Sequence, residues 1–313
     1  MLEQKIAKPF IRTKYRSINR FVWRKEERTA FWFVAPFIIG FLLFYMFPTF
    51  YALVISFLDY NSFRELKNLQ FVGLDNYSRI FNDVIALSAY VKSFLFTAIF
   101  VPVQIILALL LAVLFNKKFY MKTFSRTLIM MPYVTNIVAV TIVFSILLNP
   151  FDGIVNTILK AAGVEEPPLW LGGIDSALPT VALIQVWHTL AFPTITFLGA
   201  LQAVPAELYE AADIDGASHW KKLRLVMLPM ISPTTFFLVV TGIIGSFQNY
   251  AIFKNLTNGG PGTSSRVISL NIYEEAFVYN HFSYASAQAI LLFLFILGIT
   301  LFQWGVQKKW VHY

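Results

Sequence analysis

The 313-residue chain contains no cysteine, and only 13% of its residues are charged. The missing cysteines exclude disulfides, thiolate catalysis and cysteine-based metal sites. A soluble domain carries about 25% charged residues. The small charged fraction, together with 57% hydrophobic residues, therefore indicates an integral membrane protein. No GxxxxGK[ST] sequence occurs, so no nucleotide site of that type is expected in this chain.

The apolar residues are concentrated in long runs that contain no Asp, Glu, Lys or Arg. Each run is long enough to cross a bilayer as a helix, which takes about 20 residues. Strand-like alternation is absent, and several runs contain prolines that are expected to kink them. The predicted fold class is all-α, a polytopic membrane protein with six transmembrane helices near residues 31–57, 93–115, 127–148, 178–203, 229–250 and 286–307.

Lys and Arg are unevenly divided between the two sides of these runs. Of the 25 in the chain, 18 lie on the side that holds both termini. Cytoplasmic segments are enriched in Lys and Arg, so both termini are expected in the cytoplasm. Residues 1–30 then form a basic tail, either an interfacial helix or a solvated anchor, and residues 31–313 form the transmembrane domain. Because topology accounts for the net charge of +8, no nucleic acid partner is expected.

The spans also lack the groups that drive transport or catalysis. His188 is the only ionisable side chain among His, Asp, Glu, Lys and Arg within them. A single histidine in a span is more often a hydrogen-bonded packing residue than a proton relay, although a proton-coupled carrier stays open as an alternative. A membrane-embedded enzyme is disfavoured because no carboxylate or metal-ligand cluster lies in the runs. The chain is therefore either a passive path or part of a machine powered by another subunit.

A polar segment, residues 205–229, separates the fourth and fifth runs on the cytoplasmic side. Glu207 favours the positive N-terminal end of a first short helix. Gly216 is placed to end that helix in a left-handed conformation, and Ser218 can cap a second one. The spacing predicts a helix–turn–helix on the cytoplasmic face, either a docking knob or an ordinary connecting loop.

The segment contains Glu210-Ala211-Ala212, Gly216 and Leu228-Pro229 at a fixed spacing. This pattern resembles the EAA signature of binding-protein-dependent ABC importer permeases, with Val226 where isoleucine is usual. The resemblance implies a type I importer permease fold whose coupling loop docks on a separate ATPase, which binds ATP and magnesium. No cofactor is then expected in this chain. The implied coupling residues are Glu210, Ala211, Ala212, Asp213, Asp215, Gly216, Leu228 and Pro229.

Further stretches are similar to permeases of the maltose, lactose and glycerol-3-phosphate class. They include FVAPFIIGFLLFYMFPTFYALVISF in the first run, FVGLDNYSRIF after it and LTNGGPGTSSRVISLNIYEEAF before the last run. Three shorter matches, MMPYVTN, WHTLAF and SFQNY, imply a path for the substrate. Sugars present hydroxyls to amides and C–H faces to aromatic rings. The implied path residues are Tyr133, Asn136, Phe192, Ser246, Gln248, Asn249 and Tyr250.

The resemblance implies a non-enzymatic transport subunit in the bacterial inner membrane. It would form half of a translocation path for sugars or oligosaccharides with a second, different permease chain. An ATPase dimer would bind at the cytoplasmic face, and an extracytoplasmic solute-binding protein would deliver the substrate. The alternative is a permease of the same fold for an acidic solute, such as a glycerol phosphodiester or an acidic oligosaccharide.

Overall fold

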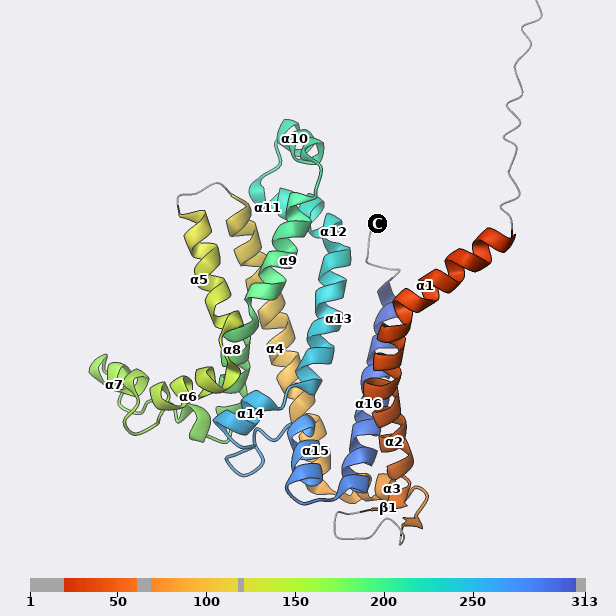
Figure 1. Ribbon diagram of the computed structural model, residues 1–313. Helices are drawn as coiled ribbons and strands as arrows, with labels where there is room; N and C mark the ends of the chain where they lie inside the picture. The colour runs from red at the N-terminus through yellow and green to blue at the C-terminus, as the bar shows by residue number, and fades with distance from the viewer. Residues whose placement is uncertain (1–19, 61–68, 118–120, 308–313) are drawn as a thin grey trace, which may run out of the picture. The chain divides into compact units, whose positions relative to one another are not determined.

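The computed structural model describes residues 20–60, 69–117 and 121–307. The chain divides into two compact units, residues 1–51 and 52–313. The described part is built mainly of helices (Figure 1), which confirms the predicted class. Its strands are β1 (Leu58–Asp59) and β2 (Gln70–Phe71), which pair antiparallel with Leu58 opposite Phe71. The predicted basic tail falls largely outside the described residues.

The first unit is a helix with a local widening. It comprises α1 (Arg20–Phe41), the π-helical turn η1 (Leu42–Met46) and the start of α2 (Phe47–Ile55), which continues into the second unit. Pro48 has no N–H for the helix ladder, and its ring crowds the carbonyl four residues earlier. The π-helical turn η1 ends two residues before Pro48, and the helix continues through the proline as α2.

The second unit is organised around the 33-residue helix α4 (Val84–Asn116). Asp83 caps it by accepting hydrogen bonds from the backbone N–H groups of Ile85, at 2.9 Å, and Ala86, at 3.1 Å. The other helices before the cytoplasmic segment are α3 (Asp75–Asn82), α5 (Lys122–Val134), α6 (Ile137–Leu147), α7 (Ile154–Ala161), the 3-10 turn η3 (Trp170–Gly172), α8 (Ala177–Thr189) and α9 (Ala191–Gln202).

After α9 the chain forms four short helical elements, then the long helix α13, the shorter helices α14 and α15, and the long helix α16. The elements are α10 (Ala206–Ile214), α11 (His219–Lys222), the π-helical turn η4 (Leu223–Met227), α12 (Leu228–Met230), α13 (Ser232–Gln248), α14 (Ala251–Leu256), α15 (Ile268–Phe277) and α16 (Phe282–Gln307). Figure 1 shows α10 and α14 at opposite ends of the second unit. A core of buried side chains, including Phe96, Phe253 and Leu270, joins α4 to α14 and α15.

The described residues contain three helices that are long and apolar enough to cross a membrane, residues 28–55, 84–116 and 282–307. Three bent pairs pass the same test when each pair is taken together, so the number rises to six if each pair is one span. The bends measure 98° between α5 and α6, 51° between α8 and α9, and 69° between residues 219–230 and 232–248. Four prolines lie beside these bends, namely Pro132, Pro193, Pro229 and Pro233. Pro102 lies inside the continuous helix α4, so not every proline of the apolar runs breaks its helix.

Candidate functional site

The segment between α9 and α13 forms the predicted helix–turn–helix. Gly216 has a φ of +67°, the left-handed conformation in which glycine carries no side-chain penalty. The N–H of Ala217 donates to the Ala212 carbonyl at 2.9 Å, and that of Gly216 donates to the Asp213 carbonyl at 3.0 Å. These two bonds are a Schellman motif, which explains why a glycine follows Ala212 at this spacing.

The turn is completed by a cap and an ion pair. Ser218 Oγ accepts a hydrogen bond from the Lys221 N–H at 3.4 Å, so the second short helix starts where the sequence predicts. Lys222 pairs with Asp213 across the turn. Together these contacts tie α10 to α11 and give the segment one defined shape.

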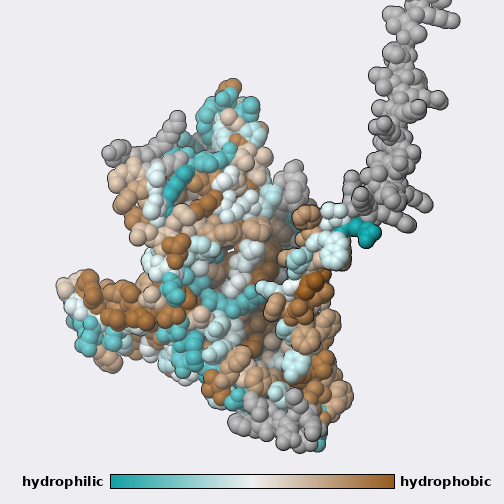
Figure 2. Space-filling view, viewed as in Figure 1, coloured by the Kyte–Doolittle hydropathy of each residue, from teal (hydrophilic) through white to brown (hydrophobic). Residues whose placement is uncertain are grey.

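The structure spreads the predicted coupling residues over this segment. Glu210, Ala211, Ala212 and Asp213 lie in α10, Asp215 and Gly216 in the turn, and Leu228 and Pro229 in α12. Of these, Ala212 and Pro229 are partly buried and the others are exposed. Polar side chains gather over α10 (Figure 2).

Large apolar side chains on the same segment also face outward. Ile214 is 87% exposed, Trp220 70% and Leu225 69%. Single exposed apolar residues are common, but here three lie on one short polar segment. The sequence analysis passed over these residues, although three large apolar side chains in a polar segment were a visible signal.

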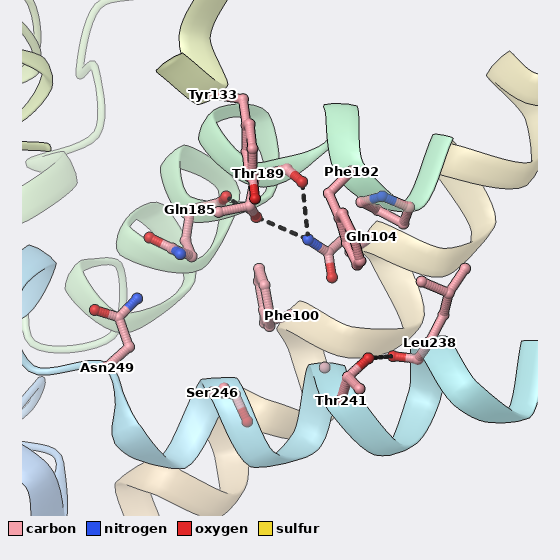
Figure 3. A pocket seen from close by; sticks show the side chains of 13 residues that line it. Phe100, Gln104, Tyr133, Gln185, Thr189, Phe192, Leu238, Thr241, Ser246 and Asn249 are labelled. Atoms are coloured by element: carbon pink, nitrogen blue, oxygen red, sulfur yellow. Dashed lines mark hydrogen bonds between the residues drawn. The ribbon is translucent and has the colours of Figure 1, made fainter. Parts of the chain in front are cut away.

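A cavity of about 230 Å³ lies between α4, α5, α8, α9 and α13. Figure 3 shows Gln104 of α4 directed at Thr189 near the break between α8 and α9. The lining residues share one property, which is that none is charged. They are Phe100, Gln104, Tyr133, Gln185, Thr189, Phe192, Pro193, Leu238, Thr241, Gly242, Gly245, Ser246 and Asn249.

Four of the predicted path residues, Tyr133, Phe192, Ser246 and Asn249, line this cavity. Ser246 is buried, and its Oγ lies 2.7 Å from Thr97 Oγ1 of α4. That contact also joins α13 to α4.

The other three predicted path residues do not line the cavity. Asn136 caps α6, its side chain accepting from the Val138 N–H at 2.8 Å. Tyr250 stacks on Tyr273 with ring centroids 4.9 Å apart. Gln248 is exposed on α13. Their roles in a path stay predictions.

Two glutamines of the cavity wall were missed by sequence reasoning. Gln104 and Gln185 lie in long apolar helices, and a polar residue in such a run is itself a signal of packing or function. Neither glutamine belongs to the three short matches from which the path residues were predicted. Their neighbour His188 lies beside the break between α5 and α6, with Nε2 3.2 Å from the Thr135 carbonyl oxygen.

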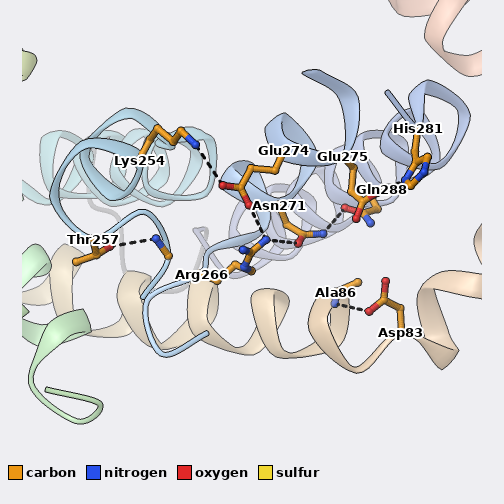
Figure 4. Close-up of polar contacts among 11 residues, drawn as sticks. Asp83, Ala86, Lys254, Thr257, Arg266, Asn271, Glu274, Glu275, His281 and Gln288 are labelled. Carbon is orange, nitrogen blue, oxygen red and sulfur yellow. Dashed lines mark hydrogen bonds and ion pairs between the residues drawn. The ribbon is translucent and has the colours of Figure 1, made fainter. Parts of the chain in front are cut away.

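A second polar cluster holds α14, α15 and the segment between them together (Figure 4). Glu274 of α15 is buried and pairs with Arg266 at 2.6 Å and Lys254 at 3.3 Å. Asn271 Nδ2 donates to Gln288 Oε1 of α16 at 3.0 Å. Because each charge has an opposite charge beside it, the cluster has a structural explanation.

This architecture matches that of a known protein family. The family model described as "Binding-protein-dependent transport system inner membrane component" matches residues 104–309. The chain belongs to this family. The match confirms the resemblance carried by the EAA signature, and the permease is thereby a transport subunit of an ABC importer.

Individual relatives cover most of the permease. The probable ABC transporter permease protein YurN of Bacillus subtilis is 31% identical over 87% of this chain and 93% of its own. The sn-glycerol-3-phosphate transport system permease protein UgpA of Agrobacterium fabrum is 31% identical over 90% of this chain and 94% of its own. The chain of a bacterial alginate ABC transporter in a crystal structure shares the fold, with a TM-score of 0.82 and 22% identity over 93% of this chain and 97% of its own.

Proposed function

We propose that this permease forms half of the translocation path of an ATP-driven importer for sugars or oligosaccharides in the bacterial inner membrane. The arrangement has six spans, counting each bent pair as one, with both termini in the cytoplasm. A second, different permease chain supplies the other half. A solute-binding protein delivers the substrate on the extracytoplasmic side, and a separate ATPase dimer binds ATP and magnesium.

The observation that carries the mechanical part is the shape of residues 206–230. A Schellman turn, an N-cap and an ion pair fix a short helical knob whose outer surface holds Ile214 and Trp220. A rigid knob with exposed apolar side chains suits a groove of the ATPase. ATP-driven closure of the ATPase pair would move the knob, and the bent helix that follows it would transmit this motion to the cavity.

Co-purification tests the docking role. The permease is purified in detergent together with its ATPase, and the wild type is compared with the double variant Glu210→Lys, Ile214→Glu. Both positions are exposed, so the variant is expected to fold and to lose at least about tenfold of the bound ATPase. The matched control is Glu207→Lys, an exposed residue in the first turn of the same helix.

Two outcomes would count against this role. If the ATPase stays with the double variant as with the wild type, residues 206–230 do not form the docking surface. If the ATPase is lost equally from the Glu207→Lys control, the effect is one of general charge and not of the knob.

The substrate class rests on the cavity and on the relatives. Amide groups and aromatic rings line the cavity, and sugars offer hydroxyls to the former and C–H faces to the latter. The relatives' names supply a second candidate, an acidic solute, because they include a glycerol-3-phosphate permease and an alginate transporter. Uptake of labelled sugars in cells with and without the permease tests the class.

A further inference from the structure

The cavity wall has a hydrogen-bonding character that separates neutral from anionic substrates. An anion such as a phosphate or carboxylate needs donors or cations, whereas a polyhydroxylated neutral molecule brings its own donors. The hydrogen-bond donors and acceptors that the lining residues leave free therefore determine which kind of molecule the wall complements.

The hydroxyl protons of the lining are already used inside the protein. Thr189 Oγ1 donates to the Gln185 carbonyl at 2.7 Å, and Thr241 Oγ1 donates to the Phe237 carbonyl at 2.8 Å. Ser246 Oγ donates to the Ile243 carbonyl at 2.7 Å. With their protons directed at these carbonyls, the three hydroxyls offer lone pairs to a molecule in the cavity.

The orientation of Gln104 follows from the same network. Because the Thr189 proton goes to a backbone carbonyl, Thr189 Oγ1 must accept from its other neighbour, which is Gln104 Nε2 at 2.7 Å. The Gln104 amide nitrogen also lies 3.4 Å from the Thr189 carbonyl oxygen. Its amide oxygen has no hydrogen-bond donor within the described part of the chain.

Gln185 adds an acceptor of the same kind. Its side chain is only 8% exposed, and its Oε1 is buried without a hydrogen-bond partner among the described residues. A buried carbonyl oxygen without a hydrogen-bond partner destabilises the protein. A hydroxyl donor reached by a small rotation of the Gln185 side chain would remove that destabilisation, whereas an anionic oxygen would be repelled.

We infer that Gln185 and Gln104 make this wall selective for an uncharged, polyhydroxylated substrate and unfavourable to a carboxylate or phosphate. The inference rests on the proposed function and narrows its substrate class. Oxygen acceptors outnumber free donors on the wall, and no lining residue carries a charge. The donors left over are the Tyr133 hydroxyl and the amide groups of Gln185 and Asn249, which suit the oxygens of the same hydroxylated ligand.

The missing cysteines make a direct test possible, since an introduced thiol is unique in this chain. Gly245 lines the cavity, and a Cβ added there meets no other atom within 4 Å, so Gly245→Cys is expected to fold. Membranes that contain the assembled importer are treated with methanethiosulfonate reagents that carry an anionic sulfonatoethyl, a cationic trimethylammonioethyl or a neutral hydroxyethyl group. The reaction rate of the introduced thiol is measured from the increase in the mass of this chain. Each rate is divided by the rate of the same reagent with 2-mercaptoethanol, which corrects for the reactivity of the reagent itself.

The normalised anionic rate is expected to be at least about tenfold below the cationic rate, with the neutral reagent between them. Adding Gln185→Lys should reverse the order, because it places a cation on the wall. Gln202→Lys, an exposed residue of α9 outside the cavity lining, should leave the order unchanged.

Two results would contradict the inference, and only one of them would also contradict the proposed function. An anionic rate equal to or above the cationic rate in the Gly245→Cys protein would overturn the inference and would indicate that the assembled path attracts acidic solutes, while leaving the permease function intact. Failure of all three reagents to reach the introduced thiol, with ATP and without it, would show that the cavity is not on an aqueous path. That result would overturn both the inference and the proposed function.

Discussion

At the scale of single residues, backbone conformation decides the shape of residues 206–230. Gly216 is in the left-handed region and closes α10 through two backbone hydrogen bonds. A side chain at this φ costs about 1–2 kcal/mol. Space is not the obstacle, because a Cβ at Gly216 meets no atom within 4 Å.

Gly216→Ala is therefore expected to destabilise the turn by about 1–2 kcal/mol without disturbing the spans. Hydrogen exchange of residues 206–218 should rise by roughly tenfold. Gly199→Ala in α9, where a Cβ also meets no atom within 4 Å but φ is ordinary, should leave this exchange unchanged. Equal exchange in the wild type and Gly216→Ala would contradict the role of the left-handed turn.

Asp83 is a second residue whose contribution can be measured. Burial raises the pKa of its carboxyl. Hydrogen bonds from Tyr284 and from the N–H groups of Ala86 and Ile85, together with the charge of Arg79, lower that pKa by more than burial raises it. The net pKa therefore lies below the usual value. A carboxylate with a lowered pKa stabilises the folded state at pH values above the unfolded pKa of about 3.9. That stabilisation is lost as the pH falls through the folded pKa.

Asp83→Ala is expected to cost about 1 kcal/mol at pH 7, because α4 loses its cap. The difference in Tm between wild type and variant should shrink as the pH falls below about 4. Asp75→Ala, an acidic residue in the first turn of α3 where no side-chain cap bond is made, serves as the control. A difference that stays constant down to about pH 3 would contradict the cause given for the lowered pKa.

At the scale of elements, buried charges join helices that the sequence separates. Glu274 is 4% exposed and faces two cations from α14 and the following segment. Removing its charge takes the counter-charge from Arg266, whose side chain is 17% exposed, and from Lys254, whose side chain is 33% exposed. Because water reaches both cations in part, the cost is expected to lie below the roughly 3–5 kcal/mol of a fully buried pair.

Glu274→Gln is therefore expected to lower the free energy of unfolding by about 2 kcal/mol. The neighbouring change Glu275→Gln should cost less than about 1 kcal/mol, because the paired His281 side chain is 44% exposed. The two variants are compared with the wild type by thermal unfolding of the detergent-purified proteins. Similar losses for both variants would show that burial of the first pair contributes little.

At the scale of the whole molecule, the open question is which loops share a side of the membrane. The distribution of Lys and Arg predicts that the segment around α10 is cytoplasmic and that the loop containing α7 is external. In intact cells a membrane-impermeant maleimide should label Thr157→Cys of α7 but not Ala217→Cys beside α10. Labelling of both is expected after the cells are opened. Reaction of Ala217→Cys in intact cells would overturn the topology.

The sequence alone determined the all-α class, the apolar runs, the family and the turn at Gly216. These follow from local patterns: long apolar stretches, glycine at a left-handed position and serine at a helix start. The bends beside Pro132, Pro193 and Pro229 were expected in kind but not in size, because proline removes a hydrogen bond without fixing the angle that neighbouring helices impose.

Only the tertiary structure decided which polar side chains meet. Gln104 and Thr189 are 85 positions apart and Thr97 and Ser246 are 149 apart, and no local pattern links either pair. Their contacts depend on α4 packing against α8 and α13, since burial removes the water that would otherwise satisfy these groups. For the same reason, only some of the predicted path residues line the cavity. The packing of the helices brings Tyr133 and Asn249 to the cavity wall and leaves Gln248 exposed.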